Sequence, residues 1–189
     1  GGVFVGVIAF RAFFAVWPDA TAAGVLHGLA ANARTSCGGR LMRRETLHLT
    51  LAFLGDVSRE RLAEAKRVAD GIRVDAFELN LDRLGYWKHN RILWAGGVSP
   101  RLTLLADALA GGLRAADFRL EARPFVAHMT LLRDARCSET ETPVLGEPVA
   151  WPVREFVLVE SRLSREGAHY EAIGRWPLAA AGGMRGVGD

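Results

Sequence analysis

The 189-residue chain has only two cysteines, two lysines and no apolar run long enough to cross a membrane. Cys37 and Cys137 stand far apart and outside any C-x-x-C spacing, which argues against a disulfide-rich secreted fold and against a structural zinc site. A reducing, cytoplasmic location is therefore the default expectation. The apolar segment at 1–10 lacks a basic start and ends at Arg11, so we predict an extension into the first strand, not a signal peptide or membrane span.

Because lysine is so rare, nearly all of the positive charge comes from arginine, and the formal net charge is only +3. Alanine and glycine are abundant too, so compositional bias is the simplest explanation of the global arginine count. Arginine still presents a planar fork that suits phosphate. A net charge this small permits a nucleic-acid partner without demanding one. With 50% hydrophobic and 24% charged residues, the composition is that of a globular domain.

The chain contains an internal repeat of a strand, a helix and a second strand. The first unit spans 11–54 and the second spans 91–134. Each unit has a buried strand, then a polar residue suited to cap a helix with one apolar face, and then an alternating strand. The residues expected on these apolar faces are Val25, Leu26 and Leu29 in the first helix and Leu102, Leu105, Leu109 and Leu113 in the second. Between the units, Ser58 is suited to cap a third helix. A chance alignment of two such units is the weaker explanation, because equivalent residues keep one offset. Three pairs are each 80 positions apart: Arg11 and Arg91, Asp19 and Ser99, His48 and His128.

Linkers rich in proline, glycine or serine are missing, so the two units are expected to be lobes of one domain over 1–178, followed by a flexible tail at 179–189. Several connections are too short for helical crossovers, which favours mainly antiparallel sheets over a parallel doubly wound sheet. The predicted fold is therefore α+β and bilobal. It has pseudo-twofold symmetry, helices packed outside and a central cleft. Further strands are predicted at 77–81, 153–160 and 170–178.

The second strand of each unit carries a His-x-Thr pair. Side chains alternate along a strand, so His48 and Thr50 share one face, as do His128 and Thr130. The other face of each strand is apolar. Duplication then places two polar faces opposite one another, with two imidazoles and two hydroxyls around a groove.

This combination suits in-line displacement at phosphorus, which needs a base for the attacking oxygen and an acid for the departing one. Histidine, with an ordinary pKa of about 6.5, can serve as either near neutral pH. The threonine hydroxyls could hold the non-bridging phosphate oxygens. A metal site is disfavoured, because no carboxylate or cysteine accompanies the histidines at ligand spacing. His27, His89 and His169 occur in a helix or in turns, and a structural role is expected for each.

Two further residues follow the histidines by five positions. Arg133 could neutralise phosphate charge, but strict alternation puts it on the face opposite His128 unless the strand ends or bulges after Leu132. Phe53 could stack on a base, although the general habit of strand phenylalanines favours core packing.

Taken in order, these motifs resemble the 2H phosphoesterase superfamily and, more narrowly, the RNA 2′,3′-cyclic phosphodiesterases once called 2′-5′ RNA ligases. The resemblance covers roughly residues 11–178. Thr46 stands where the family often has asparagine, and Ala127 where it usually has proline. The matching stretches are RAFFAVWP (11–18), ETLHLTLAFLGDV (45–57), RPFVAHMTLLRDA (123–135) and FVLVESRL (156–163).

The resemblance implies hydrolysis of RNA 2′,3′-cyclic phosphate ends to a 2′-phosphomonoester, with water attacking phosphorus and the 3′-oxygen departing. It implies that His48 donates a proton to that oxygen while His128 activates water, that Arg133 contacts phosphate, and that Phe53 lies beside the base. We expect no cofactor and no metal, so activity should persist in EDTA. The expected partner is RNA with a cyclic phosphate end, bound by a monomer.

Three alternatives remain at this point. The reverse reaction would join RNA ends through a 2′-5′ link, although water is far more abundant than RNA ends. An RNA-binding module that has lost catalysis need not keep both histidines and both threonines, and this chain has all four. The same chemistry could also act on a smaller cyclic phosphate.

Overall fold

The computed structural model describes residues 10–138 and 144–180, so the predicted N-terminal extension and the tail from 181 lie outside the described residues. The described helices are α1 (Ala20–Cys37), η1 (Arg44–Thr46, 3₁₀), α2 (Arg59–Asp70) and α3 (Pro100–Ala115). The described strands are β1 (Phe10–Val16), β2 (Arg40–Leu41), β3 (Leu49–Val57), β4 (Phe77–Leu81), β5 (Arg83–Trp87), β6 (Ile92–Gly96), β7 (His128–Arg133), β8 (Val149–Val153), β9 (Glu155–Ser164) and β10 (Gly167–Pro177).

Each long helix begins at a polar cap that satisfies an otherwise free backbone N–H. The side chain of Asp19 accepts a hydrogen bond from the amide of the third residue beyond it at 2.8 Å. Ser58 and Ser99 do the same at 3.2 Å, and Pro100 follows Ser99 as the first residue of α3. These starts confirm the sequence prediction for all three helices.

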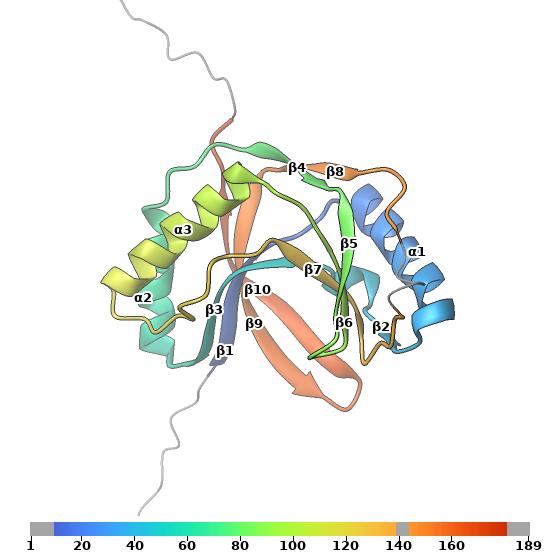
Figure 1. Ribbon diagram of the computed structural model, residues 1–189. Coiled ribbons are helices and arrows are strands. Elements are labelled where there is room, and N and C mark those ends of the chain that lie inside the picture. Colours follow the sequence, from blue (N-terminus) through green and yellow to red (C-terminus); the bar gives the residue numbers. More distant parts are fainter. Residues whose placement is uncertain (1–9, 139–143, 181–189) are drawn as a thin grey trace, which may run out of the picture.

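The main sheet has the order β10-β9-β1-β3-β7-β6-β5, with β2 added beside β7, and β4 pairs with β8 in a separate ribbon. Every pairing between these named strands is antiparallel. Figure 1 shows α2 and α3 on one side of the sheet's centre and α1 on the other, at the periphery. The α+β prediction with mainly antiparallel sheets is therefore confirmed, and the parallel alternative is excluded.

Each repeat unit pairs with a strand that follows the other unit in the sequence. Strand β5 follows the first unit in sequence but pairs with β6 of the second, whereas β9 follows the second and pairs with β1 of the first. Helix α1 of the first unit contacts β7, and α3 of the second contacts β3. Because both exchanges bury surface that neither half could cover alone, we infer that the described chain to 178 forms a single domain. Beyond it, Ala179 forms a bridge with Asp75.

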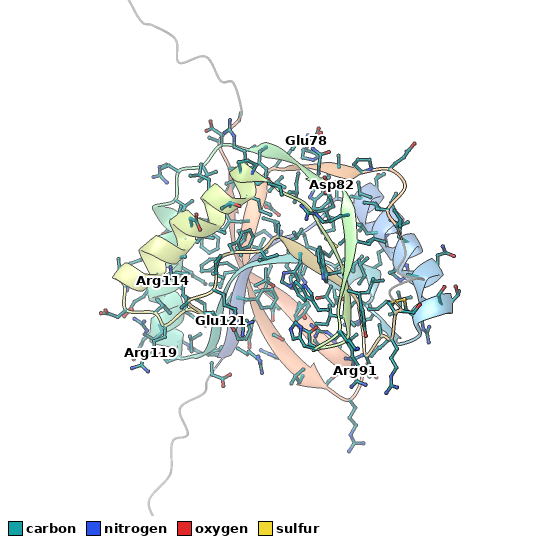
Figure 2. All side chains as sticks on the ribbon, in the orientation of Figure 1. Glu78, Asp82, Arg91, Arg114, Arg119 and Glu121 are labelled. Carbon is teal, nitrogen blue, oxygen red and sulfur yellow. A yellow bond between two sulfur atoms is a disulfide. The ribbon has the colours of Figure 1, made fainter. Side chains whose placement is uncertain are left out.

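The core lies between the sheet and the helices, and charged side chains such as Glu78 and Arg91 lie at the periphery (Figure 2). The leucines predicted to form the inner face of α3 are all fully buried: Leu102, Leu105, Leu109 and Leu113. The face predicted for α1 was partly wrong, because Val25 is 49% exposed. Alanines at 22, 30 and 33 join Leu26 there instead, since small side chains let the helix approach its neighbours closely. None of the described helices is long and apolar enough to span a bilayer.

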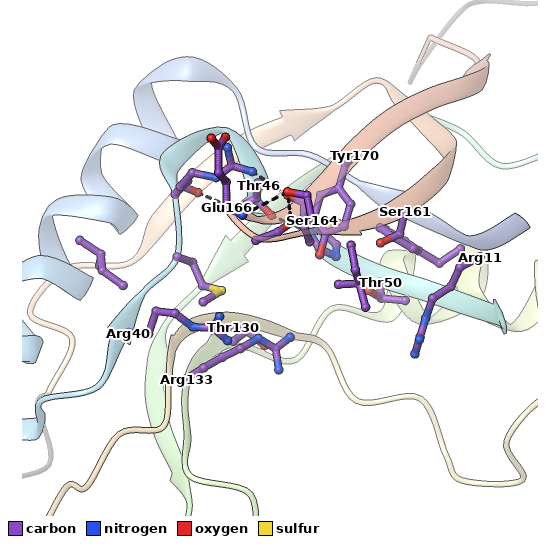
Figure 3. A pocket seen from close by; sticks show the side chains of 18 of the residues that line it. Arg11, Arg40, Thr46, Thr50, Thr130, Arg133, Ser161, Ser164, Glu166 and Tyr170 are labelled. Carbon is purple, nitrogen blue, oxygen red and sulfur yellow. Dashed lines mark hydrogen bonds between the residues drawn. The ribbon is translucent and has the colours of Figure 1, made fainter. Parts of the chain in front are cut away.

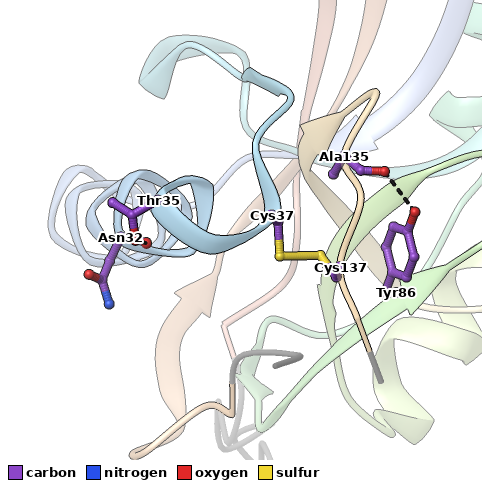
Figure 4. Close-up of a disulfide and its surroundings, with 6 residues drawn as sticks. All are labelled: Asn32, Thr35, Cys37, Tyr86, Ala135 and Cys137. Atoms are coloured by element: carbon purple, nitrogen blue, oxygen red, sulfur yellow. Dashed lines mark hydrogen bonds between the residues drawn. A yellow bond between two sulfur atoms is a disulfide. The ribbon is translucent and has the colours of Figure 1, made fainter. Parts of the chain in front are cut away.

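A disulfide joins Cys37, the last residue of α1, to Cys137, with the two Cα atoms 4.5 Å apart (Figure 4). Their separation of 100 residues concealed this pairing at the sequence level. The neighbouring backbone is held too. The amide of Arg136 donates to the carbonyl of Cys37 at 2.8 Å, and the Tyr86 hydroxyl donates to the carbonyl of Ala135 at 2.7 Å. The bond therefore ties the end of α1 to the segment that follows β7.

Breaking this bond should destabilise the fold, because it closes a long loop in the unfolded chain. For Cys137→Ala we expect the free energy of unfolding to fall by about 2–4 kcal/mol, and dithiothreitol should affect the natural sequence similarly. Urea unfolding followed by circular dichroism measures both. Dithiothreitol should leave the unfolding midpoint of Cys137→Ala unchanged. If dithiothreitol left the urea unfolding midpoint of the natural sequence unchanged, the expectation would be contradicted.

Candidate active site

Strands β3 and β7 meet at the centre of the sheet, where Leu49 pairs with Met129. Both residues are fully buried. In an antiparallel register, this pairing places each histidine beside the threonine of the other strand, on the face opposite the two buried side chains. No other Cα pair joins β3 to β7 within the described residues, so the two halves of the sheet diverge from this point.

The diverging halves enclose a cleft of about 750 Å³. All six residues predicted from the sequence line it: His48, His128, Thr50, Thr130, Arg133 and Phe53. Figure 3 shows Thr50 and Thr130 on its opposing walls, with Arg133 below them and Tyr170 above. His27, His89 and His169 do not line this cleft.

Arg133 reaches the cleft because β7 contains a bulge. Leu93 and Trp94 are neighbours on β6, yet they pair with Leu132 and Thr130, which leaves Leu131 as an extra residue. An extra residue reverses the alternation beyond it, so Arg133 returns to the His/Thr face. The condition set by the sequence analysis is met, with the bulge one residue earlier than the position considered there.

The same irregularity occurs in β3. Phe14 and Ala15 are neighbours on β1, yet they pair with Ala52 and Thr50, which leaves Leu51 as the extra residue. Phe53 therefore turns to the cleft and is 45% exposed, so the expectation of core packing was wrong. The guanidinium carbon of Arg11 lies 5.3 Å from the centre of its ring. The two extra leucines are themselves 80 positions apart, so the bulge belongs to the repeat.

His48 is held by a hydrogen bond and by a box of aromatic rings. Its Nδ1 lies 2.6 Å from the backbone carbonyl of Thr46, which can only accept, so Nδ1 carries the proton and Nε2 stays free. The imidazole stacks against both Phe13 and Trp17, with ring centres 4.9 and 4.7 Å away, and makes a T-shaped contact with Tyr170 at 5.3 Å. Threonine at position 46, in place of the asparagine that is frequent in the family, does not affect this contact, because the backbone carbonyl makes it.

This environment lowers the pKa of His48 to about 4. Burial is the main cause, because it penalises the charged imidazolium. The positive charge of Arg133 and the nearby His128 lower the pKa further, while the hydrogen bond to Thr46 opposes the shift. His48 is therefore neutral at neutral pH in the unliganded protein, and its free Nε2 is a proton acceptor.

His128 has the same backbone support in a different setting. Its Nδ1 donates to the carbonyl of Val126 at 3.0 Å, again two residues earlier. Instead of an aromatic box, it has the edge-on ring of Trp87, 4.8 Å away between centres. Both imidazoles thus use Nδ1 for a carbonyl and leave Nε2 for chemistry.

Sequence reasoning missed several residues of this site. Phe13, Trp17 and Tyr170 form the box around His48, and Arg11 covers Phe53. Phe13 and Trp17 belong to the matching stretch at 11–18, so their roles were hidden inside a motif read only as a buried strand. Within the described residues, no cluster of three or more His, Cys, Asp or Glu side chains could hold a metal ion.

The described geometry can be compared with known proteins. RNA 2′,3′-cyclic phosphodiesterase of Escherichia coli is 37% identical over 172 residues, covering 89% of this chain and 96% of that protein. The Thermus thermophilus protein of the same name is 28% identical, covering 89% and 90%. The crystal structure of E. coli LigT with 3′-AMP matches with a TM-score of 0.82 and 34% identity, covering 90% of this chain and 99% of that one.

A model of one family, described as LigT-like phosphoesterase, matches twice, at residues 16–94 and 95–170. The first match contains most of the first repeat unit and the second match most of the second, and together they cover most of the chain. They confirm the resemblance inferred from the twin His-x-Thr motifs. The chain belongs to the LigT-like phosphoesterase family.

Proposed function

We propose that the chain hydrolyses the 2′,3′-cyclic phosphate at an RNA end to a 2′-phosphomonoester, with His48 and His128 as its acid–base pair. One observation carries the proposal: two imidazoles, each oriented through Nδ1 by a carbonyl two residues earlier, line one cleft with two threonines and an arginine. The relatives from E. coli and T. thermophilus, both named RNA 2′,3′-cyclic phosphodiesterase, support the substrate class.

In this reaction, water attacks phosphorus while the bond from phosphorus to the 3′-oxygen breaks on the opposite side. One imidazole takes a proton from water and the other gives a proton to the 3′-oxygen. The hydroxyls of Thr50 and Thr130 would donate to the non-bridging oxygens, and Arg133 would balance their growing negative charge. Phe53 and the covering Arg11 offer a flat surface for the base.

The family resemblance assigns the acid role to His48, yet its lowered pKa leaves it neutral in the unliganded protein. A bound phosphodiester resolves this conflict. Its negative charge raises the pKa of the neighbouring imidazole and offsets the opposing charge of Arg133. We propose that His48 takes up its proton as substrate binds, and that His128 is the base which activates water.

Removing either imidazole should abolish most turnover. For His48→Ala and His128→Ala we expect kcat to fall by about 10²–10⁴-fold, because each loses one proton transfer. The assay incubates RNA bearing a 2′,3′-cyclic end and separates the products. His27→Ala, which changes a histidine outside the cleft, serves as the control. A 2′-5′ joined product in large excess over the 2′-phosphate would contradict hydrolysis, and an unaffected variant would contradict the assigned pair.

The acid and base roles can be separated with a substrate whose 3′ bridging oxygen is replaced by sulfur. A thiolate leaves without protonation, since thiols ionise near pH 8.5. His48→Ala should therefore lose about 100-fold or more on the oxygen substrate but less than about 10-fold on the sulfur substrate. His128→Ala should lose activity on both. Rescue of His128→Ala instead would reverse the assignment.

The lowered pKa of His48 also predicts how stability depends on pH. Between pH 6.5 and 4 the unfolded chain binds a proton that the folded chain excludes, so stability falls as pH falls through this range. At pH 4.5 the loss from this residue should be about 2–3 kcal/mol relative to pH 7. Urea unfolding at both pH values measures how much unfolding free energy is lost between pH 7 and pH 4.5. We expect that loss to be smaller by about 2–3 kcal/mol in His48→Gln than in the natural sequence. Equal losses would mean that His48 titrates normally.

A further inference from the structure

We propose that Arg40, Arg43 and Arg165 form a second phosphate subsite, so that the preferred substrate is an oligonucleotide with a cyclic end and not a cyclic mononucleotide. The inference rests on the proposed function and specifies its substrate class. The subsite would hold an upstream phosphate of the same RNA strand.

The first support is the concentration of charge in the cleft. Glu166 is the single acidic residue among the lining residues that the structure describes, against five arginines, which gives a formal charge of +4. The whole chain carries only +3, so all remaining residues together are slightly negative. Compositional bias explains many arginines but not their gathering around one cleft. The five are Arg11, Arg40, Arg43, Arg133 and Arg165.

The second support is that a cyclic mononucleotide leaves most of these arginines unused. It has one phosphate, which Arg133 and the threonines serve, and one base, which Phe53 and Arg11 serve. Figure 3 shows Arg40 beside Arg133 on one side of the cleft and Arg11 on the other, beyond Thr50. Arg40, one of the three remaining arginines, thus extends the site away from the base surface.

The fold brings these three arginines together from separate elements. Arg40 in β2 pairs with Arg133 of β7, so it continues directly from the reacting phosphate. Arg165 lies in the turn between β9 and β10. Arg43 links the two regions, because its Nη2 donates to the carbonyl of Ala168 at 2.6 Å. A guanidinium has five N–H donors, so this bond leaves Arg43 others for a phosphate.

The side chains are also free to bind. Arg40 and Arg165 are exposed, and neither forms a side-chain hydrogen bond or ion pair with another described residue. Some arginines outside the cleft are paired instead, for example Arg162 with Glu160 and Arg175 with Glu155. Like charges gathered without counterions repel one another, and an anionic strand would relieve that repulsion. The guanidinium fork suits a phosphate in particular.

The test compares a 2′,3′-cyclic mononucleotide with a tetranucleotide that has the same cyclic end. The natural sequence should show kcat/KM at least about 10-fold higher for the tetranucleotide, as one or two charge-assisted contacts allow. In Arg40→Ala/Arg165→Ala this ratio should fall towards one. Arg101→Ala removes an exposed arginine on α3 outside the cleft, and it should leave the ratio unchanged.

Binding without turnover gives an independent readout. In the His128→Ala background, the Kd of the tetranucleotide should rise with salt, with a slope of about 0.7 in log–log form for each phosphate contact. Adding Arg40→Ala/Arg165→Ala should reduce that slope by about 0.7 to 1.4. Equal kcat/KM for both substrates, or an unchanged ratio and slope in the double variant, would overturn the subsite. Failure of the natural sequence to turn over either substrate would instead overturn the proposed function, while the salt slope still decides the subsite.

Discussion

The pairing of Leu49 with Met129 is the contact on which the cleft depends. Antiparallel strands alternate their faces with a period of two, so a slip of one residue would turn the histidines and threonines into the core and the leucines into the cleft. Burial prevents that slip. Leu49, Met129 and Leu131 are fully buried beneath helices that cross from the opposite unit, and Leu51 is 6% exposed. The hydrophobic core therefore sets the position of the polar site.

Beyond this pairing, the two repeat units have equivalent backbone positions but bring different side chains to the cleft. Both central strands share a bulge at the same repeat position, so the fifth residue after each histidine faces the cleft. That residue is Phe53 in one unit and Arg133 in the other, which gives one wall an aromatic surface and the other a charge. The histidines diverge in the same way. An aromatic box surrounds His48, whereas His128 has, among the described residues, a single T-shaped contact, with Trp87. A symmetric scaffold thus holds a chemically asymmetric site.

Local patterns predicted the features that depend on nearby residues. The helix caps, the α3 leucines and the facing His/Thr pairs all follow from spacing along the chain. Features that depend on distant partners were missed. The bulges are visible only in the pairing with β1 and β6, the disulfide joins residues 100 positions apart, and Pro152 disguises β8, whose strand character comes from its pairing with β4. Val25 and Phe53 were placed wrongly because apolar side chains do not reveal which face a fold will cover.

Electrostatic interactions couple substrate binding to the protonation of His48. Burial beside the aromatic rings disfavours an imidazolium at His48, and the positive charge of Arg133 adds to that effect, so the unliganded cleft keeps His48 neutral. A phosphodiester between Arg133 and the two imidazoles reverses the balance, since it cancels the arginine field at the point where a proton is needed. A neutral ligand of the same shape would leave His48 without its proton. Selectivity for a phosphate ester and readiness to protonate its leaving oxygen would then have one electrostatic origin.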